Sequence, residues 1–95
     1  MVYEWDEGKN ALNIAKHGLD FTDAWRAIED PRRITFADGR KDYGEERFVT
    51  IGRVEEEIVA VACHTDRSGA VRIISLRKAS KKERGVYYGK SQSGF

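Results

Sequence analysis

The sequence predicts an α+β fold, with helices near both ends of the chain and a run of strands between them. Three short apolar runs rich in β-branched residues follow one another at 47–54, 58–65 and 71–76, as adjacent strands do. The turns between these runs are short, which favours antiparallel neighbours. We therefore expect an antiparallel sheet with two N-terminal helices and one C-terminal helix.

The first predicted helix spans 7–17 and follows a short strand at 3–5. Asp6 has the side chain of an N-cap, and Gly18 suits the left-handed position that ends many helices. Spacing by three and four residues gives the helix a polar stripe made of Lys9, Asn13, Lys16 and His17. Its apolar face is modest and consists of Leu12 and Ala15.

The second helix is predicted from apolar residues at helical spacing, namely Phe21, Ala24, Trp25 and Ile28. Asp20 or Thr22 can cap its start, and Asp30-Pro31 ends it. A strand at 33–37 and a polar loop at 38–45 follow. Both tryptophans and Phe21 are expected in the core.

The last helix is predicted at 81–88. Ser80 and Glu83 have the spacing of a capping box, in which each side chain bonds the backbone N–H of the other residue. Around this helix start the chain is rich in cations: Arg72, Arg77, Lys78, Lys81, Lys82 and Arg84. We expect one domain over residues 1–90 and a flexible C-terminal tail at 91–95.

Charge is divided unevenly along the chain. Residues 1–65 hold nine Lys and Arg against fourteen Asp and Glu, a net charge of −5, whereas residues 66–95 hold eight against two, a net charge of +6. This asymmetry fits one basic face, and it also fits a solvated surface with charges of both signs. No apolar run has the length of a membrane helix and no signal-peptide pattern is present, so we expect a cytoplasmic protein without membrane contact.

Several kinds of site are disfavoured by the sequence. It contains no P-loop, no dinucleotide-binding glycine pattern and no nucleophile elbow. His17 and His64 have no second ligand at metal spacing, so neither a metal nor another cofactor is expected. Cys63 and His64 adjoin in a strand and point to opposite faces, which disfavours a Cys–His nucleophile. Cys63 is expected to be a small core residue, and His64 to be partly buried in line with Ala60 and Ala62.

The remaining polar residues suit cleavage of RNA without a metal. That reaction requires a base for the 2′-hydroxyl, cations for the phosphorane and an acid for the 5′-oxygen. Arg77 and Arg72 are candidates for phosphate stabilisation because the planar guanidinium matches phosphate oxygens. Glu45 is the candidate base, kept ionised by Arg47.

Two further groups complete the candidate site. Lys16 and His17 are expected to supply another cation or the general acid. The residues expected to bind the RNA backbone or bases are Lys78, Lys81, Lys82, Arg84 and Tyr87. Of Tyr87 and its neighbour Tyr88, one is expected to pack on the sheet and the other to stack on bases.

Strand alternation limits this assignment. Arg72 and Arg77 are five residues apart, so they face opposite sides of a regular strand. They converge only if the strand ends or bulges before Arg77; otherwise Arg77, nearer the basic helix, is preferred. Structural interpretations remain open for each candidate: edge cations that deter aggregation, a surface ion pair of Glu45 with Arg47, and helix capping by His17.

Three segments of the chain carry residues found together in one known family. The first is Trp5-Asp6, Lys9, Asn13, Lys16-His17-Gly18, Phe21 and Ala24; the second is Gly44-Glu45-x-Arg47 and Ile51-Gly52; the third is Arg72-Ile73-Ile74-Ser75-x-Arg77-x-Ala79, Glu83 and Tyr87. In order and spacing they resemble the BrnT family. One departure is Leu76, where the family pattern favours a small residue.

The resemblance implies a type II toxin–antitoxin toxin with a RelE-like fold. It further implies metal-independent RNA cleavage, inhibition of translation and neutralisation by a BrnA-type antitoxin, through which the complex binds operator DNA. The alternative is a non-catalytic module that binds nucleic acid or protein, such as an inactive toxin relative. A module of that kind predicts a graded, salt-dependent loss of binding as each cation is removed.

Overall fold

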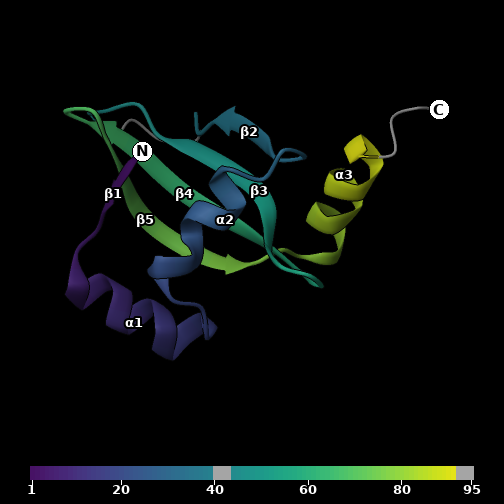
Figure 1. Ribbon diagram of the computed structural model, residues 1–95, viewed down its shortest axis with the longest axis horizontal. Coiled ribbons are helices and arrows are strands. Elements are labelled where there is room, and N and C mark those ends of the chain that lie inside the picture. The colour runs from purple at the N-terminus through teal and green to yellow at the C-terminus, as the bar shows by residue number, and fades with distance from the viewer. Residues whose placement is uncertain (40–43, 92–95) are drawn as a thin grey trace.

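The fold has the predicted order of elements (Figure 1). The computed structural model describes residues 1–39 and 44–91, so part of the predicted loop and the tail at 92–95 lie outside the described residues. The elements are β1 (Val2–Glu4), α1 (Glu7–His17), the 3-10 turn η1 (Phe21–Asp23), α2 (Ala24–Ile28), β2 (Ile34–Ala37), β3 (Phe48–Glu55), β4 (Ile58–Arg67), β5 (Ala70–Lys78) and α3 (Lys81–Ser91).

The sheet has five strands in the order β1-β5-β4-β3-β2. β2, β3, β4 and β5 pair antiparallel, but β1 runs parallel to β5, with Tyr3 opposite Val71. The expectation of an antiparallel sheet is therefore wrong for this strand, and the sheet is mixed. β1 joins the sheet beside its last strand, and a pairing over such a sequence distance leaves no mark in the local pattern.

One face of the sheet, called here the α2 face, carries the larger apolar core. Its buried residues are Leu19, Phe21, Ala24, Ala27, Ile28, Val54, Ala60, Ala62, Val71, Ile73 and Leu76. Gly52 permits the close approach of α2, because a Cβ there would lie 2.3 Å from the carbonyl oxygen of Ala27. Trp25, expected in the core, is 43% exposed, since the helix begins as a 3-10 turn and a uniform helical period does not apply.

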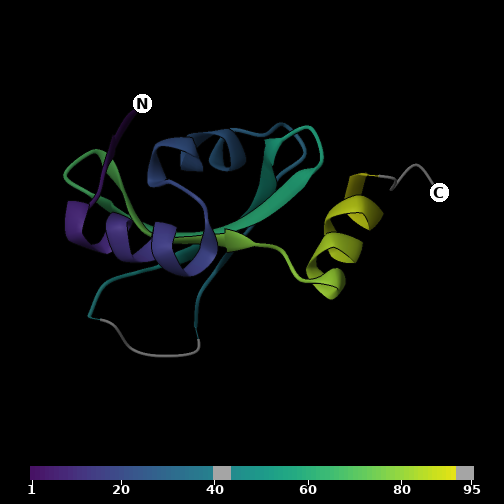
Figure 2. The same ribbon diagram turned by 90° about the horizontal axis from the view of Figure 1, so that it is seen from below.

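The opposite face, called here the α3 face, carries a second cluster at one end. Its buried residues are Val49, Ile51, Val59, Val61, Ala79 and Tyr87. Figure 2 shows α2 along one side of the sheet and α3 set apart at one end. The predicted capping box is confirmed at the start of α3: Glu83 N–H donates to Ser80 Oγ at 3.1 Å, and Ser80 N–H donates to Glu83 Oε1 at 2.8 Å.

α1 has the predicted bounds and caps, but it docks through amides instead of an apolar face. Asp6 accepts from the N–H of Lys9, and Gly18 has a φ of 73°. The side-chain amide of Asn13 donates to the carbonyl of Leu76 at 2.8 Å and accepts from its N–H at 3.2 Å. This single side chain thus pairs with the edge of β5 as a short strand would. Leu12, expected on the apolar face, is exposed.

Candidate functional site

A β-bulge brings the two candidate arginines of β5 to the same face. His64 pairs with Ile73 whereas Cys63 pairs with Ser75, so Ile74 is an extra residue in β5. Beyond it, Arg72 pairs with Thr65 and Arg77 with Val61. Because β4 is regular and these two partners are four residues apart, both arginines project from the α3 face, about 13 Å apart along the strand.

Near the Arg72 end of that face, Glu45 lies between two arginines. Its carboxylate accepts from Arg67 Nε at 3.2 Å and from Arg67 Nη2 at 3.1 Å, and Arg47 Nε lies 3.6 Å away. The hydrogen bond from Arg67, followed by the charges of both arginines, holds the pKa of Glu45 below its usual range. The predicted pair of Glu45 with Arg47 is present, but Arg67 is the principal partner.

Sequence reasoning missed Arg67 because it ends β4 beside a hairpin turn of ordinary composition, 22 residues from Glu45. The hydroxyl of Thr65 donates to the backbone carbonyl of Glu46 and holds the Glu45 segment over β4. Arg72 joins the group through Glu4, which accepts from Arg72 Nη1 at 3.2 Å and whose charge also acts on Arg67. We call Glu4, Glu45, Arg47, Arg67 and Arg72 the Glu45 cluster.

Arg77 belongs to a second group beside α3. Two bonds, of 2.7 and 2.8 Å, join its guanidinium to the carboxylate of Glu83. The hydrogen bond from Arg77 lowers the pKa of Glu83 to about 2. A groove of about 190 Å³ is lined by Phe36, Ala37, Asp38, Gly39, Val49, Val61, Cys63, Arg77 and Glu83. Cys63 is half-buried at the wall of this groove, not enclosed in the core as expected.

Lys16 and His17 lie in a third group, where α1 meets the bulge of β5. A groove of about 240 Å³, called here the α1–β5 groove, is lined by Lys9, Leu12, Asn13, Lys16, His17, Ile74 and Ser75. The predicted polar stripe of α1 therefore faces one hollow. No contact joins Lys16 or His17 to Glu45 among the described residues.

The basic residues around α3 are mostly at the surface. Lys78, Lys81, Lys82 and Arg84 are exposed, and Arg84 Nη1 also donates to the carbonyl of Ala79. Tyr87 is 1% exposed, and its hydroxyl donates to Asp30 Oδ2 at 2.6 Å. This burial contradicts the expected contact of Tyr87 with RNA: of the two tyrosines, Tyr87 packs on the sheet and Tyr88 is the more exposed.

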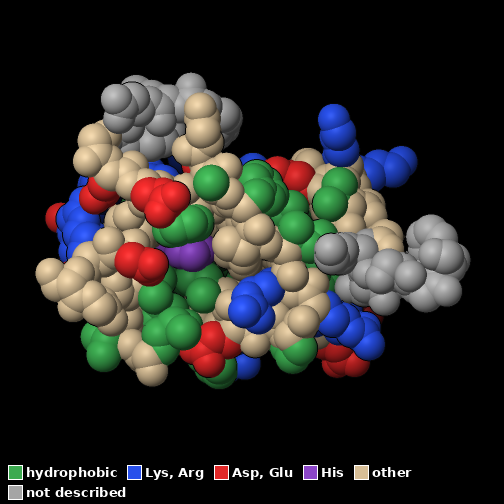
Figure 3. All heavy atoms as spheres, turned by 90° about the horizontal axis from the view of Figure 1, so that it is seen from above, with side chains coloured by type: hydrophobic (Ala, Val, Ile, Leu, Met, Phe, Trp, Pro, Cys, Tyr) green, Lys and Arg blue, Asp and Glu red, His purple; other side chains and the backbone are tan. Residues whose placement is uncertain are grey.

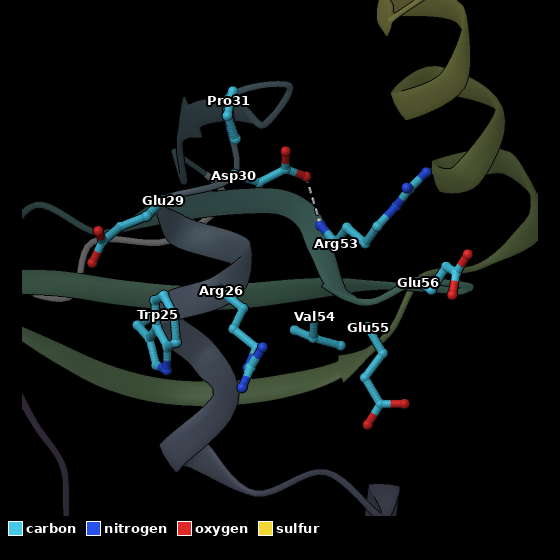
Figure 4. A pocket seen from close by; sticks show the side chains of 9 residues that line it. All are labelled: Trp25, Arg26, Glu29, Asp30, Pro31, Arg53, Val54, Glu55 and Glu56. Carbon is cyan, nitrogen blue, oxygen red and sulfur yellow. Dashed lines mark hydrogen bonds between the residues drawn. The ribbon is translucent and has the colours of Figure 1, made fainter.

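Charge on the molecular surface is mixed. In Figure 3, basic side chains form separate groups with acidic ones among them, so this side carries no continuous basic patch. Figure 4 shows a further pocket, of about 380 Å³, between α2 and the β3–β4 turn. Arg26 and Arg53 share its wall with four carboxylates, and its Asp30 is bonded to the N–H of Arg53. This pocket contains none of the sequence-predicted site residues.

His64 lies away from the α3 face. It is 7% exposed, stacks on Phe48 and shares a 2.8 Å hydrogen bond between its Nε2 and the hydroxyl of Thr50. Burial lowers the pKa of His64. The expectation of a partly buried histidine is confirmed, and the register keeps this side chain out of the candidate site.

The described residues contain neither a metal-binding cluster nor a membrane-spanning helix. No group of three or more His, Cys, Asp or Glu side chains is placed to hold a metal ion within 1–39 and 44–91. None of the helices in the same ranges has the length and apolar character needed to cross a membrane.

Comparison with known proteins gives the chain a family. Residues 5–83 match the family described as "Ribonuclease toxin, BrnT, of type II toxin-antitoxin system". The crystal structure of the ribonuclease toxin BrnT from Brucella abortus is similar, with a TM-score of 0.67 and 29% identity over 85% of this chain and all of that one. No curated protein sequence matches closely enough to indicate a relative. The match over most of its length shows that the chain belongs to the BrnT family of ribonuclease toxins.

Proposed function

We propose that this protein is a metal-independent endoribonuclease that inhibits translation by cleaving RNA on the α3 face of its sheet. The observation that carries the proposal is the Glu45 cluster, in which two carboxylates, those of Glu45 and Glu4, lie among three arginines. Arg77 projects from the same face because of the bulge. A carboxylate beside several guanidinium groups is what attack of a 2′-hydroxyl on its neighbouring phosphate requires.

In this mechanism Glu45 accepts the proton of the 2′-hydroxyl. The 2′-oxygen then bonds to phosphorus, the bond to the 5′-oxygen breaks, and a 2′,3′-cyclic phosphate remains. While it is paired with Arg67, Glu45 is a weak base, since its pKa is low. A phosphate that binds Arg67 and Arg47 competes for those donors and returns the pKa of Glu45 toward its usual range, where the carboxylate is a better base.

The cations have separate roles in the proposed cleavage mechanism. Arg72 and Arg67 stabilise the phosphorane beside Glu45, and Arg77 binds phosphate farther along β5. Lys16 and His17, in the α1–β5 groove, supply a further cation for the RNA or the proton for the leaving 5′-oxygen. The side chains proposed to hold the backbone of the RNA beyond β5 are Lys78, Lys81, Lys82 and Arg84, all exposed.

The family membership extends the proposal to partners. Proteins of type II toxin–antitoxin systems act with a protein antitoxin, and we propose a BrnA-type antitoxin here, with operator DNA contacted chiefly through that antitoxin. RNA is the proposed substrate, and the cytoplasm the proposed location. The fold is proposed to be RelE-like.

The test is cleavage of RNA by the purified protein in EDTA, beside growth arrest on induced expression. Arg72→Ala is expected to lower cleavage at least ~100-fold, the usual loss when one transition-state donor is removed, and Arg77→Ala is expected to lower it as well, because a phosphate contact along β5 is lost. Glu45→Gln is also expected to lower cleavage at least ~100-fold, because a glutamine side-chain amide cannot accept the proton of the 2′-hydroxyl at neutral pH. Arg32→Gln is the matched control, since it removes one charge from the exposed turn after α2.

Three outcomes would contradict the proposal. A folded Arg77→Ala variant with full activity would exclude Arg77 from the site. Cleavage that appears only when Mg²⁺ is restored would end the claim of metal independence. Folded wild-type protein that neither cleaves RNA nor arrests growth would favour the alternative function.

That alternative is a non-catalytic binding module. The observation in its favour is that Glu45 and Arg77 are each engaged by two hydrogen bonds in ion pairs, as in a purely structural role. A module of this kind would bind RNA or protein with a graded, salt-dependent loss as each cation is removed, and no single substitution would abolish an activity.

A further inference from the structure

We propose that the α1–β5 groove binds a phosphate of the RNA backbone other than the one that is cleaved. This subsite rests on the proposed function, which makes RNA the substrate. The subsite gives Lys9 and Ser75, which have no role in the cleavage step, a role in substrate binding. It also makes the groove an extension of the Glu45 cluster.

The groove has rigid walls. One is α1, which is held to β5 by the two hydrogen bonds between Asn13 and the backbone of Leu76. Lys9 and Lys16 are seven residues apart on this helix, so their Cα atoms lie about 10.5 Å apart on the same face. The other wall is the bulge, where Ile74 and Ser75 line the hollow.

The lining has the chemistry of an anion site. It holds three basic side chains, those of Lys9, Lys16 and His17, and no carboxylate. None of the three forms an ion pair within the part of the chain that the structure describes. In the other two groups, by contrast, Glu45 pairs with Arg67 and Glu83 pairs with Arg77. The cations of the α1–β5 groove are therefore available to a phosphate without breaking an existing pair.

Three neighbours of the cations, Ser75, Leu12 and Ile74, adapt the groove to a nucleotide. The register pairs Ser75 with Cys63, which places Ser75 on the α3 face, where its hydroxyl can donate to a phosphate oxygen. Leu12 and Ile74 add an apolar surface beside it. A phosphate needs donors and a ribose or base needs apolar contact, and both are present in this hollow.

The groove adjoins the Glu45 cluster through Asp6. The carboxylate of Asp6 caps α1, and the charges of both Lys9 and Arg72 act on it. Arg72 belongs to the cluster and Lys9 to the groove, so an RNA strand that lies along β5 meets both. Ser75 pairs with Cys63 and Arg72 pairs with Thr65. These partners are two residues apart on β4, so Ser75 and Arg72 are separated by about the distance between neighbouring side chains on one strand face.

The experiment measures binding separately from cleavage. A short single-stranded RNA with 2′-O-methyl groups throughout cannot be cut by its own 2′-oxygen, and its affinity is measured by fluorescence anisotropy over a range of salt concentrations. Lys9→Gln, Lys16→Gln, the double variant and Ser75→Ala are compared with wild type. Arg32→Gln is the control, with one charge removed from the far end of α2.

Each lysine variant is expected to raise Kd roughly tenfold at low salt. Each is also expected to reduce the slope of log Kd against log salt concentration by about 0.7, the value for one phosphate contact on a single strand. Ser75→Ala is expected to raise Kd with the slope unchanged, because its hydroxyl carries no charge.

The subsite is overturned if the double variant matches Arg32→Gln in both Kd and slope while its circular dichroism shows a folded protein. Wild-type cleavage of unmodified RNA, measured beside this assay, separates the two proposals. If the wild type cleaves RNA but the double variant has the same Kd and slope as Arg32→Gln, the subsite alone is rejected. Wild-type protein that neither binds nor cleaves RNA rejects the subsite together with the proposed function.

Discussion

Tyr87 donates its hydroxyl hydrogen to the carboxylate of Asp30, 57 residues away in the sequence, and so joins α3 to the end of α2. The same carboxylate accepts the N–H groups of Arg53 and Arg32. Burial acts to raise the pKa of Asp30, but these hydrogen bonds outweigh it and hold the pKa below the usual range. Burial, together with the bond to Asp30, raises the pKa of Tyr87 to about 12.

The first prediction concerns this link. Tyr87→Phe keeps the buried ring and removes only the hydroxyl, so the free energy of unfolding is expected to fall by about 1–2 kcal/mol in urea denaturation. Asp30→Asn with and without Tyr87→Phe completes a double-mutant cycle, which isolates the coupling between the two side chains. A coupling energy of zero would show that the hydrogen bond does not hold α3 in place.

The second prediction concerns the contact of α2 with β3. Gly52→Ala places a Cβ 2.3 Å from the carbonyl oxygen of Ala27, a backbone atom that moves only with the helix. The free energy of unfolding is expected to fall by more than about 3 kcal/mol, or the protein not to fold.

Gly85→Ala is the matched control for that substitution. A Cβ at Gly85 meets nothing within 4 Å, and the residue lies inside α3. Alanine there is expected to stabilise the protein by up to about 1 kcal/mol, because glycine has the lower helix propensity. Equal effects of the two substitutions in urea denaturation would contradict the close approach at Gly52.

The third prediction concerns acid stability. The pKa of Glu83 is lowered from 4.5 to about 2 by Arg77, so the folded state favours the charged carboxylate. The stabilisation is complete above about pH 4.5 and is lost as the pH falls toward 2. Solvent screening of this partly exposed pair limits the loss to about 1 kcal/mol. Glu83→Gln, compared with wild type in urea from pH 5 to pH 2.5, is expected to remove this part of the pH dependence.

The fourth prediction uses the low pKa of Glu45. If Glu45 is the base, kcat/KM, which reports the enzyme without bound RNA, declines only when the pH falls below the usual range for a glutamate. Arg67→Gln removes the principal cause of the lowered pKa, so the acid limb of the pH–rate profile is expected to move to higher pH. An acid limb at the same pH in Arg67→Gln and in the Arg32→Gln control would argue against Glu45 as the base.

Local signals in the sequence predicted the elements well. Asp6 and Gly18 gave the ends of α1, and the spacing of Ser80 and Glu83 gave the capping box of α3, because each signal depends on residues within one helical turn. The fold class and the order of the elements followed from such signals. The family resemblance added the expectation of a toxin, which the match over residues 5–83 confirmed for the family.

Interactions between distant segments could not be predicted in the same way. The parallel pairing of β1, the partnership of Arg67 with Glu45 and the bond of Asn13 to β5 each join residues that are far apart in the chain. The sequence predicts Asn13 in a polar stripe. The neighbouring residues do not distinguish an asparagine that faces water from one whose amide hydrogen-bonds the backbone at a strand edge. The burial of Tyr87 likewise depends on Asp30, whose position is set by the fold.

The bulge at Ile74 has a consequence for how this strand can change in evolution. Arg72 and Arg77 share a face because the number of residues between them is even and one of these residues is left out of the pairing. Replacing Ile74 leaves that parity intact, whereas deleting it, or inserting one residue beside it, turns one arginine away from the other. This segment of β5 therefore tolerates a change of side chain at Ile74 far better than a change of length.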